Sequence, residues 1–177
     1  NISETIIYLS DTVDDFQTYF RTDKEMLDTD LNELLQRAVN FCTSRLKEKN
    51  IDIRIDVPSE IKINTYPNEF VQVILNILNN AIDAFYENNT KSPTILISVT
   101  SGNKMVFIKI SDNAGGISDD NLLKLFEPYF STKGKNGTGL GLYMSQMIVQ
   151  KQFNGEISAQ SSDNGATFSI RIPKIIS

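Results

Sequence analysis

Hydrophobic residues in the first twenty positions recur every three or four residues, as on one side of a helix. At separations of 4, 3, 4, 3 and 4 positions, they are Ile2, Ile6, Leu9, Val13, Phe16 and Phe20. This heptad spacing is typical of a helix that packs along another helix. We expect residues 1–22 to be one helix of a helical hairpin and the charged residues 23–30 to be a linker. The alternative is a first helix that packs on its own domain.

Helical and strand-like spacing alternate through the next sixty residues. Asp30 is placed to cap a helix that begins at Leu31 and carries a hydrophobic stripe as far as Leu46. Alternating hydrophobic residues in 51–57 predict a strand, and Ile61 and Ile63 predict a short second one. A long helix is expected to start at Pro67 and to reach about residue 88, since proline suits the first turn of a helix.

The remaining residues alternate in the same way. Residues 94–111 predict two strands joined by a Ser-Gly-Asn turn. A short helix follows from Ser118 to about Phe126, and another from roughly Thr138 to Phe153. A hairpin that turns over Asp163-Asn164-Gly165 closes the chain. Because helices and strands interleave with tight hairpins, the predicted fold class is an α+β sandwich with a mixed sheet.

Composition narrows the range of possible chemistry. The 177 residues include 17 basic and 22 acidic side chains, and this net charge of −5 counts against binding to nucleic acid. The absence of histidine excludes a Ser-His-Asp triad or a histidine-ligated metal within these residues. One cysteine excludes an internal disulfide, and Cys42 lies on a hydrophobic stripe, where a buried inert thiol is expected. No apolar run approaches the roughly 18–20 residues that span a bilayer.

The long helix carries amide side chains on its polar side. Asn76 and Asn80 lie one turn apart, and Asn79 stands between them in the sequence. The polar positions of this helix are Glu69, Gln72, Asn76, Asn80, Asp83 and Glu87. An amide oxygen is a hard, uncharged ligand that suits Mg²⁺ already bound to water and phosphate. An ordinary polar helix surface is the alternative.

Two glycine-rich loops follow. Asp112 comes directly after a strand and before Ala114-Gly115-Gly116, where its carboxylate could accept a hydrogen bond from an amino-substituted base. The alternative is a turn without a ligand. In the second loop, Gly137, Gly139 and Gly141 alternate where a helical pattern begins, so backbone N–H groups there could bind phosphate.

The segment between these loops has the pattern of a lid. Phe126 and Phe130 are hydrophobic anchors in a polar, glycine-flanked stretch. Lys133 and Lys135 are expected either to reach phosphates or to be solvated.

Together these segments resemble the ATP-binding catalytic domain of sensor histidine kinases, within the Bergerat-fold ATPases. NILNNAID at 76–83 is similar to the N box of that family, and DNAGGI at 112–117 to its first glycine box. FEPYF at 126–130 is similar to the F box, and GTGLGL at 137–142 to the second glycine box. Order and intervals match over residues 30–173. The resemblance implies a two-layer α+β sandwich with helices on one face of a mixed sheet.

The resemblance also implies roles for particular residues. Asn80 would be the Mg²⁺ ligand, Asn76 a supporting contact to phosphate or metal, and Asp112 the acceptor for the adenine amino group. Thr167 would lie near the adenine, and Lys133 would be the lid lysine. Glycines that would permit close approach of the nucleotide are Gly116, Gly139 and Gly141. Further matched ATP-binding positions are Asp83, Ile117, Phe130, Gly137, Thr138, Leu140 and Leu142.

Two positions depart from the family pattern. Ala114 stands where a glycine is usual, and Asp83 stands where a basic residue is often found. The related hydrolytic ATPases place a glutamate in the N box to activate water, whereas this chain has Asn76. An amide is a poor base, so the resemblance favours phosphotransfer.

The expected activity is therefore transfer of the γ-phosphoryl group of Mg·ATP to a histidine. In the family that histidine lies on the first helix of a dimerisation and phosphotransfer hairpin, and residues 1–20 are similar to the second helix. The implied partners are this upstream helix, a second copy of the chain and a response regulator receiver domain. The catalytic part is expected in the cytoplasm, and the longer protein could carry a membrane anchor. Alternatives are an anti-sigma-type serine kinase, a hydrolytic ATPase and a degenerate nucleotide-gated module.

Overall fold

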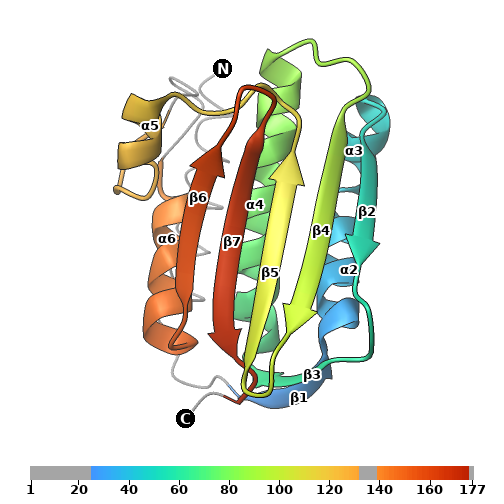
Figure 1. The fold of residues 1–177 in the computed structure, drawn as a ribbon, viewed down its shortest axis with the longest axis vertical. Coiled ribbons are helices and arrows are strands. Elements are labelled where there is room, and N and C mark those ends of the chain that lie inside the picture. Colours follow the sequence, from blue (N-terminus) through green and yellow to red (C-terminus); the bar gives the residue numbers. More distant parts are fainter. Residues whose placement is uncertain (1–24, 132–138, 176–177) are drawn as a thin grey trace, which may run out of the picture.

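The computed structural model describes residues 25–131 and 139–175, which form a five-stranded mixed sheet with helices on one face (Figure 1). In spatial order the strands are β2 (Asp52–Asp56), β4 (Thr94–Ser101), β5 (Met105–Asp112), β7 (Ala166–Pro173) and β6 (Glu156–Ser161). The helices are α2 (Leu31–Phe41), α3 (Thr43–Glu48), α4 (Pro67–Glu87), α5 (Asp119–Lys124) and α6 (Gly141–Met147). The predicted two-layer α+β sandwich is confirmed, and no helix in the described ranges is long and apolar enough to cross a membrane.

The strands of the sheet follow the alternation seen in the sequence. β2 pairs in parallel with β4, and the remaining neighbours pair antiparallel, so the sheet is mixed as predicted. On β4, Ile95, Ile97 and Val99 are buried, while Leu96 is exposed on the opposite face. The predicted closing hairpin is also confirmed, because β6 and β7 pair on either side of Asp163-Asn164-Gly165.

Helix α4 is the central element of the helical layer. Pro67 occupies its first turn as predicted, and the helix runs for 21 residues. Phe70, Ile74 and Leu78 are fully buried or nearly so beneath it. The expectation of a continuous polar side is wrong at its start, because Glu69 is only 6% exposed. The sequence pattern could not reveal this, since neighbouring elements cover the first turn.

The predicted helix from Leu31 to Leu46 is present but broken. Asp30 caps it by accepting hydrogen bonds from the backbone N–H groups of Asn32 and Glu33. At Cys42 the backbone leaves the helical conformation (φ −99°, ψ 0°), which separates α2 from α3. Cys42 is 2% exposed and burial raises the pKa of its thiol, so the sulfur stays protonated, as expected for an inert residue.

The described part of the predicted linker contains a strand that the sequence pattern did not indicate. β1 (Leu27–Asp30) pairs antiparallel with β3 (Lys62–Thr65) in a separate two-stranded sheet. Long-range pairing therefore decides the conformation of residues 27–30, and the linker over 23–30 stays a prediction. The predicted helix at 1–22 lies outside the described residues, and the domain boundary at residue 30 stays a prediction.

The last helix differs from its prediction in two ways. Gly139 and Leu140 precede it and α6 begins at Gly141, so the predicted start near Thr138 is too early. From Ile148 to Gln152 it continues as a π-helix (η2), and the backbone N–H of Phe153 bonds to the carbonyl of Ile148. This widened turn buries Phe153, whose ring stacks on Tyr66 at a centroid distance of 6.5 Å.

Candidate functional site

The candidate site lies where α4, the start of α6 and the turns at the upper end of the sheet in Figure 1 meet. Asn76 anchors α4 to α6. Its Nδ2 donates to the carbonyl of Gly141 and to Oγ of Ser145, both at 3.0 Å, and its Oδ1 accepts from Gln72 at 2.9 Å. Ser145 is fully buried and donates to the same Gly141 carbonyl at 2.9 Å. The Nδ2 end of the Asn76 amide therefore holds the first turn of α6 in place, while its Oδ1 is bonded within α4.

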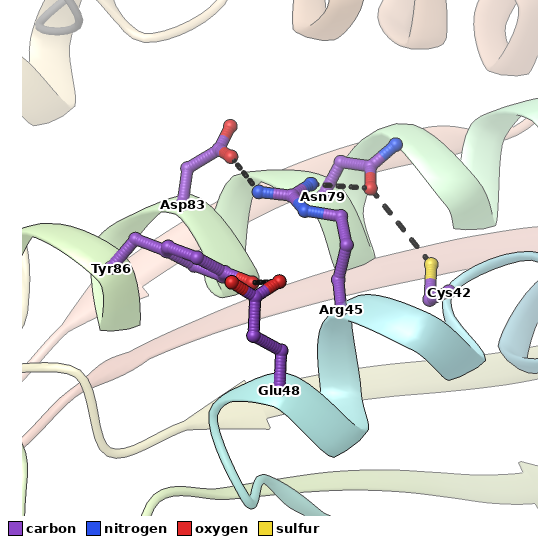
Figure 2. Close-up of polar contacts among 6 residues, drawn as sticks. All are labelled: Cys42, Arg45, Glu48, Asn79, Asp83 and Tyr86. Atoms are coloured by element: carbon purple, nitrogen blue, oxygen red, sulfur yellow. Dashed lines mark hydrogen bonds and ion pairs between the residues drawn. The ribbon is translucent and has the colours of Figure 1, made fainter.

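The other two asparagines of α4 differ in their surroundings. Oδ1 of Asn79 accepts from Arg45 at 3.0 Å and lies 3.8 Å from Sγ of Cys42 (Figure 2). Asn80 is half-buried, and its side chain makes no hydrogen bond to any residue that the structure describes. A half-buried amide oxygen without a protein partner suits a hard cation whose remaining ligands are water and phosphate. Of the three, Asn80 is the one whose amide is available for Mg²⁺.

The acidic residues of the described ranges form no metal-binding cluster of their own. No group of three or more His, Cys, Asp or Glu side chains there could hold a metal ion. Asp83, a predicted ATP-binding position, forms an ion pair with Arg45 on the side of α4 that faces α3 (Figure 2).

Asp112 ends β5 with its carboxylate largely buried. Oδ1 accepts from the backbone N–H of Ala114 at 3.0 Å and of Ala166 at 3.3 Å. Burial raises the pKa of Asp112 above its ordinary value, while these two hydrogen bonds lower it to a lesser extent. Both bonds go to the same oxygen, so Oδ2 is left to accept from a ligand amino group.

The loop after Asp112 is locked against the β6–β7 hairpin. A Cβ on Gly165 would come within 1.7 Å of the Asp112 carbonyl oxygen, and one on Gly116 within 2.3 Å of the Ser162 carbonyl oxygen. The backbone N–H of Ile117 donates to Oγ of Ser161 at 2.6 Å. The resemblance implies that the nucleotide approaches closely at Gly116 (φ +80°). In the structure, the group that lies close to Gly116 is the protein's own backbone at Ser162.

Two further contacts shape this part of the site. The hydroxyl of Thr167 lies 2.9 Å from that of Ser111 on the neighbouring strand, next to Asp112. Asn88, just after α4, donates from Nδ2 to the carbonyl of Ala114 at 2.8 Å and so ties the first glycine loop to the amide-bearing helix. Ala114 does not have a positive φ, and its methyl group is buried, so alanine fits where the family usually has glycine.

The ends of the predicted lid meet at Gly139. The backbone N–H of Tyr129 donates to the Gly139 carbonyl at 3.1 Å. Phe126 packs edge-on against Phe168 at a centroid distance of 6.3 Å, as expected of an anchor, and Phe130 is half-buried. Leu140 and half-buried Leu142 flank the start of α6. The predicted positions that lie outside the described residues are Lys133, Lys135, Gly137 and Thr138.

Alanine at position 139 should damage the site. Gly139 has φ +69°, and a Cβ there would lie 2.3 Å from the carbonyl carbon of Tyr129 and 2.4 Å from the carbonyl oxygen of Phe130. Left-handed backbone costs about 1–2 kcal/mol for alanine, and relief of the contacts must separate the two chain segments. We expect Gly139→Ala to lower the melting temperature by about 5 °C and to weaken Mg·ADP binding.

Gly102→Ala is the matched control for this prediction. Gly102 lies in the β4–β5 turn, where a Cβ would meet only the Met105 carbonyl oxygen, at an ordinary 3.7 Å. Thermal unfolding and Mg·ADP titration of both variants give the comparison. Equal effects of the two substitutions would contradict the role of Gly139.

Two residues of the site were missed from the sequence. Ser145 lies on the hydrophobic stripe of α6, and only its spacing of four from Gly141 could have indicated their hydrogen bond. Arg45 has no signal in the sequence, because its partners Asn79 and Asp83 lie 34 and 38 residues away. Figure 2 shows it reaching from α3 to both side chains on α4.

The chain is similar to known proteins over most of its length. A family model described as histidine kinase-, DNA gyrase B- and HSP90-like ATPase matches residues 65–176. Sensor histidine kinase ZraS of Salmonella typhimurium is 35% identical over 147 residues, which cover 82% of this chain and 30% of that protein. The chain thus spans about 30% of the length of this relative.

Solved structures show the same fold. The catalytic domain of histidine kinase ThkA, in a nucleotide-free form, has a TM-score of 0.75 at 27% identity and covers 85% of this chain and 97% of that one. A structure of ThkA in complex with the response regulator protein TrrA has a TM-score of 0.78 at 23% identity, and covers 98% of this chain and 49% of that one. At 23% identity, the similarity to this second structure shows a shared fold.

Proposed function

The chain belongs to the family of histidine kinase-, DNA gyrase B- and HSP90-like ATPases, and on that premise we propose that it is the ATP-binding catalytic part of a sensor histidine kinase. It transfers the γ-phosphoryl group of ATP to a histidine on an upstream helical hairpin, from which a response regulator receiver domain takes it. Mg²⁺ is the second cofactor. The longer protein acts as a homodimer, with this part in the cytoplasm.

The observation that favours phosphotransfer over hydrolysis is the environment of the polar groups on α4. Hydrolysis needs a base that activates water, and at the matching position Asn76 offers an amide, which is a poor base and is bonded to α6. The carboxylate of Asp83 is paired with Arg45, and Glu69 is buried in the first turn of the helix. A nucleophile supplied from outside the domain fits this arrangement better than an activated water.

The residues of the chain would then act by alignment and charge neutralisation, which dominate phosphoryl transfer. Mg²⁺ held at the Asn80 amide would supply positive charge to the phosphate oxygens. The Asp112 carboxylate accepts from the adenine amino group and orients the base. Asn76 and Ser145 keep the start of α6 in position, so that backbone N–H groups near Gly139 and Gly141 can face the phosphates.

The test is a phosphorylation assay on a protein extended upstream through the first hairpin helix. With γ-labelled ATP and Mg²⁺ we expect label that is acid-labile and base-stable, as a phosphohistidine is, and that is lost when the upstream histidine is replaced. The 177-residue chain alone should bind nucleotide but acquire no label, since it has no histidine.

Other results would point to the alternatives. Acid-stable label would indicate a serine kinase, and release of phosphate without label would indicate a hydrolytic ATPase. Failure of the 177-residue chain to bind Mg·ADP at millimolar concentration would contradict the proposed nucleotide site itself.

A further inference from the structure

Arg45 crosses from α3 to α4 and ends beside the face that carries Asn80. One terminal nitrogen donates to Oδ1 of Asn79 at 3.0 Å, and the other forms the ion pair with Asp83 (Figure 2). The guanidinium also lies over the ring of Tyr86, with its central carbon 5.2 Å from the centroid. Three contacts in different directions therefore fix the orientation of this cation.

Asp83 needs such a partner because of where it lies. It follows Asn80 by three residues on α4, so the two side chains are neighbours, with Cβ atoms about 5–6 Å apart. The side chain of Asp83 is 26% exposed, which means that solvent screens its charge only in part. A carboxylate at this distance repels a polyphosphate bound next to Asn80.

We infer that Arg45 is a further positioning residue of the nucleotide site, which acts through Asp83 and lets the amide face of α4 accept a nucleoside polyphosphate. This inference rests on the proposed function. Arg45 cancels the Asp83 charge and holds the carboxylate toward α3. Its own side chain is 38% exposed, so the pair lies at the edge of the site.

The charged residues next to this ion pair contact Tyr86. Lys49 lies over the ring of Tyr86, with Nζ 4.7 Å from the centroid, and Glu48 accepts from the Tyr86 hydroxyl at 2.8 Å. Lys49 and Glu48 are adjacent in the sequence, carry opposite charges and both contact Tyr86. The alternative reading is that Arg45 and Asp83 only brace α3 against α4, and this reading predicts a different pattern of variants.

The experiment is a four-protein cycle of wild type, Arg45→Gln, Asp83→Asn and the double variant, each titrated with Mg·ADP by calorimetry at low salt. We expect Arg45→Gln to weaken binding about tenfold, because Asp83 then loses its ion pair with Arg45 and its charge repels the phosphates more strongly. Asp83→Asn should tighten binding a few-fold. The double variant should return to within about threefold of wild type, because the repulsive carboxylate is gone.

Two further readouts separate charge from packing. Adenosine, which has no phosphates, should bind all four proteins equally, and the Arg45→Gln deficit should shrink as salt is raised. The melting temperature of each protein reports separately on how far Arg45 and Asp83 stabilise the packing of α3 against α4. Glutamine is polar and neutral, so it suits this partly exposed position.

A purely structural role of Arg45 and Asp83, in holding α3 against α4, would give a different result. If Asp83→Asn weakens Mg·ADP binding as much as Arg45→Gln, and the double variant is no better, the inference is wrong. Should Arg45→Gln fail to fold, the sign of the Asp83→Asn effect decides, because a brace predicts weaker binding and repulsion predicts tighter binding. If the wild-type protein does not bind Mg·ADP, the proposed function fails. If the wild type binds but the double variant does not recover affinity, only the role of Arg45 is overturned.

Discussion

Replacement of Asn80 with alanine should abolish the Mg²⁺ dependence of nucleotide binding. Asn80 is half-buried and, within the described ranges, its amide has no hydrogen-bond partner, whereas Asn76 and Asn79 are both bonded. Loss of the amide oxygen removes the protein ligand that would hold the cation beside the phosphates. We expect ADP affinity to fall at least about 100-fold in the presence of Mg²⁺, to the level measured with a chelator.

Asn68→Ala is the control for this substitution. Asn68 lies on the same helix, is exposed, and accepts a long 3.4 Å hydrogen bond from Arg37. ADP titrations of both variants with and without Mg²⁺ give the measurement, and Asn68→Ala should keep the wild-type ratio. An Asn80→Ala protein with an unchanged ratio would show that another group binds the metal.

Asp112→Asn should remove most of the preference for adenine. The acceptor Oδ1 of Asp112 is bonded to the N–H groups of Ala114 and Ala166. An asparagine that keeps those bonds must point its NH₂ group at the adenine amino group, so two donors would face each other. A hydrogen bond to a charged group contributes about 1.5–3 kcal/mol, so ADP affinity should fall about 10- to 100-fold. Titrations with ADP and GDP measure the preference, and an unchanged ratio would contradict the base contact.

The same carboxylate predicts a dependence on pH. Burial raises the pKa of Asp112, so it gains a proton at a higher pH than an ordinary aspartate. Protonation turns Oδ2 into a donor, and ADP affinity should therefore fall on acidification, beginning above the ordinary value of 3.8. Asp112→Asn is the control, because it should lack this decline.

The expected effect of this group on stability has the opposite sign. Its pKa is higher in the folded protein than in the unfolded chain, so between those two values the folded state binds more protons. The contribution of Asp112 to the free energy of unfolding is therefore most favourable at low pH and is lost as pH rises through that window. Thermal unfolding and ADP binding, measured over the same pH range, should thus respond to Asp112 in opposite directions.

Local features of the chain predicted most of the fold. Asp30 caps α2, Pro67 begins α4, and the turn over Asp163-Asn164-Gly165 joins β6 to β7, each as the residue types indicated. Hydrophobic spacing indicated α4, β4 and β5. These features could be predicted because caps, turns and periodicity involve residues only a few positions apart in the sequence. The order of the four boxes likewise led to a family that the comparisons confirm.

In two segments the local pattern did not indicate the observed structure. The residues Leu-Asp-Thr-Asp at 27–30 lack a strand pattern, and they become β1 because β3 pairs with them. The helix around Ile148 has ordinary helical spacing, and its π-helical turn accompanies the burial of Phe153 beside Tyr66. In both cases contacts with distant elements outweigh the preference of the segment.

The candidate site shows the same division. Motif spacing brought Asn76, Asn80 and Asp112 to attention, because residues one helical turn apart or at a strand end have predictable neighbours. It could not assign different tasks to the three asparagines of α4, since these depend on Ser145 in α6 and Arg45 in α3. Arg45 meets Asp83 across 38 residues of sequence. Such partnerships exist only once the helices have packed, because a side chain's charge compensation depends on distance in space and leaves no periodic trace along the chain.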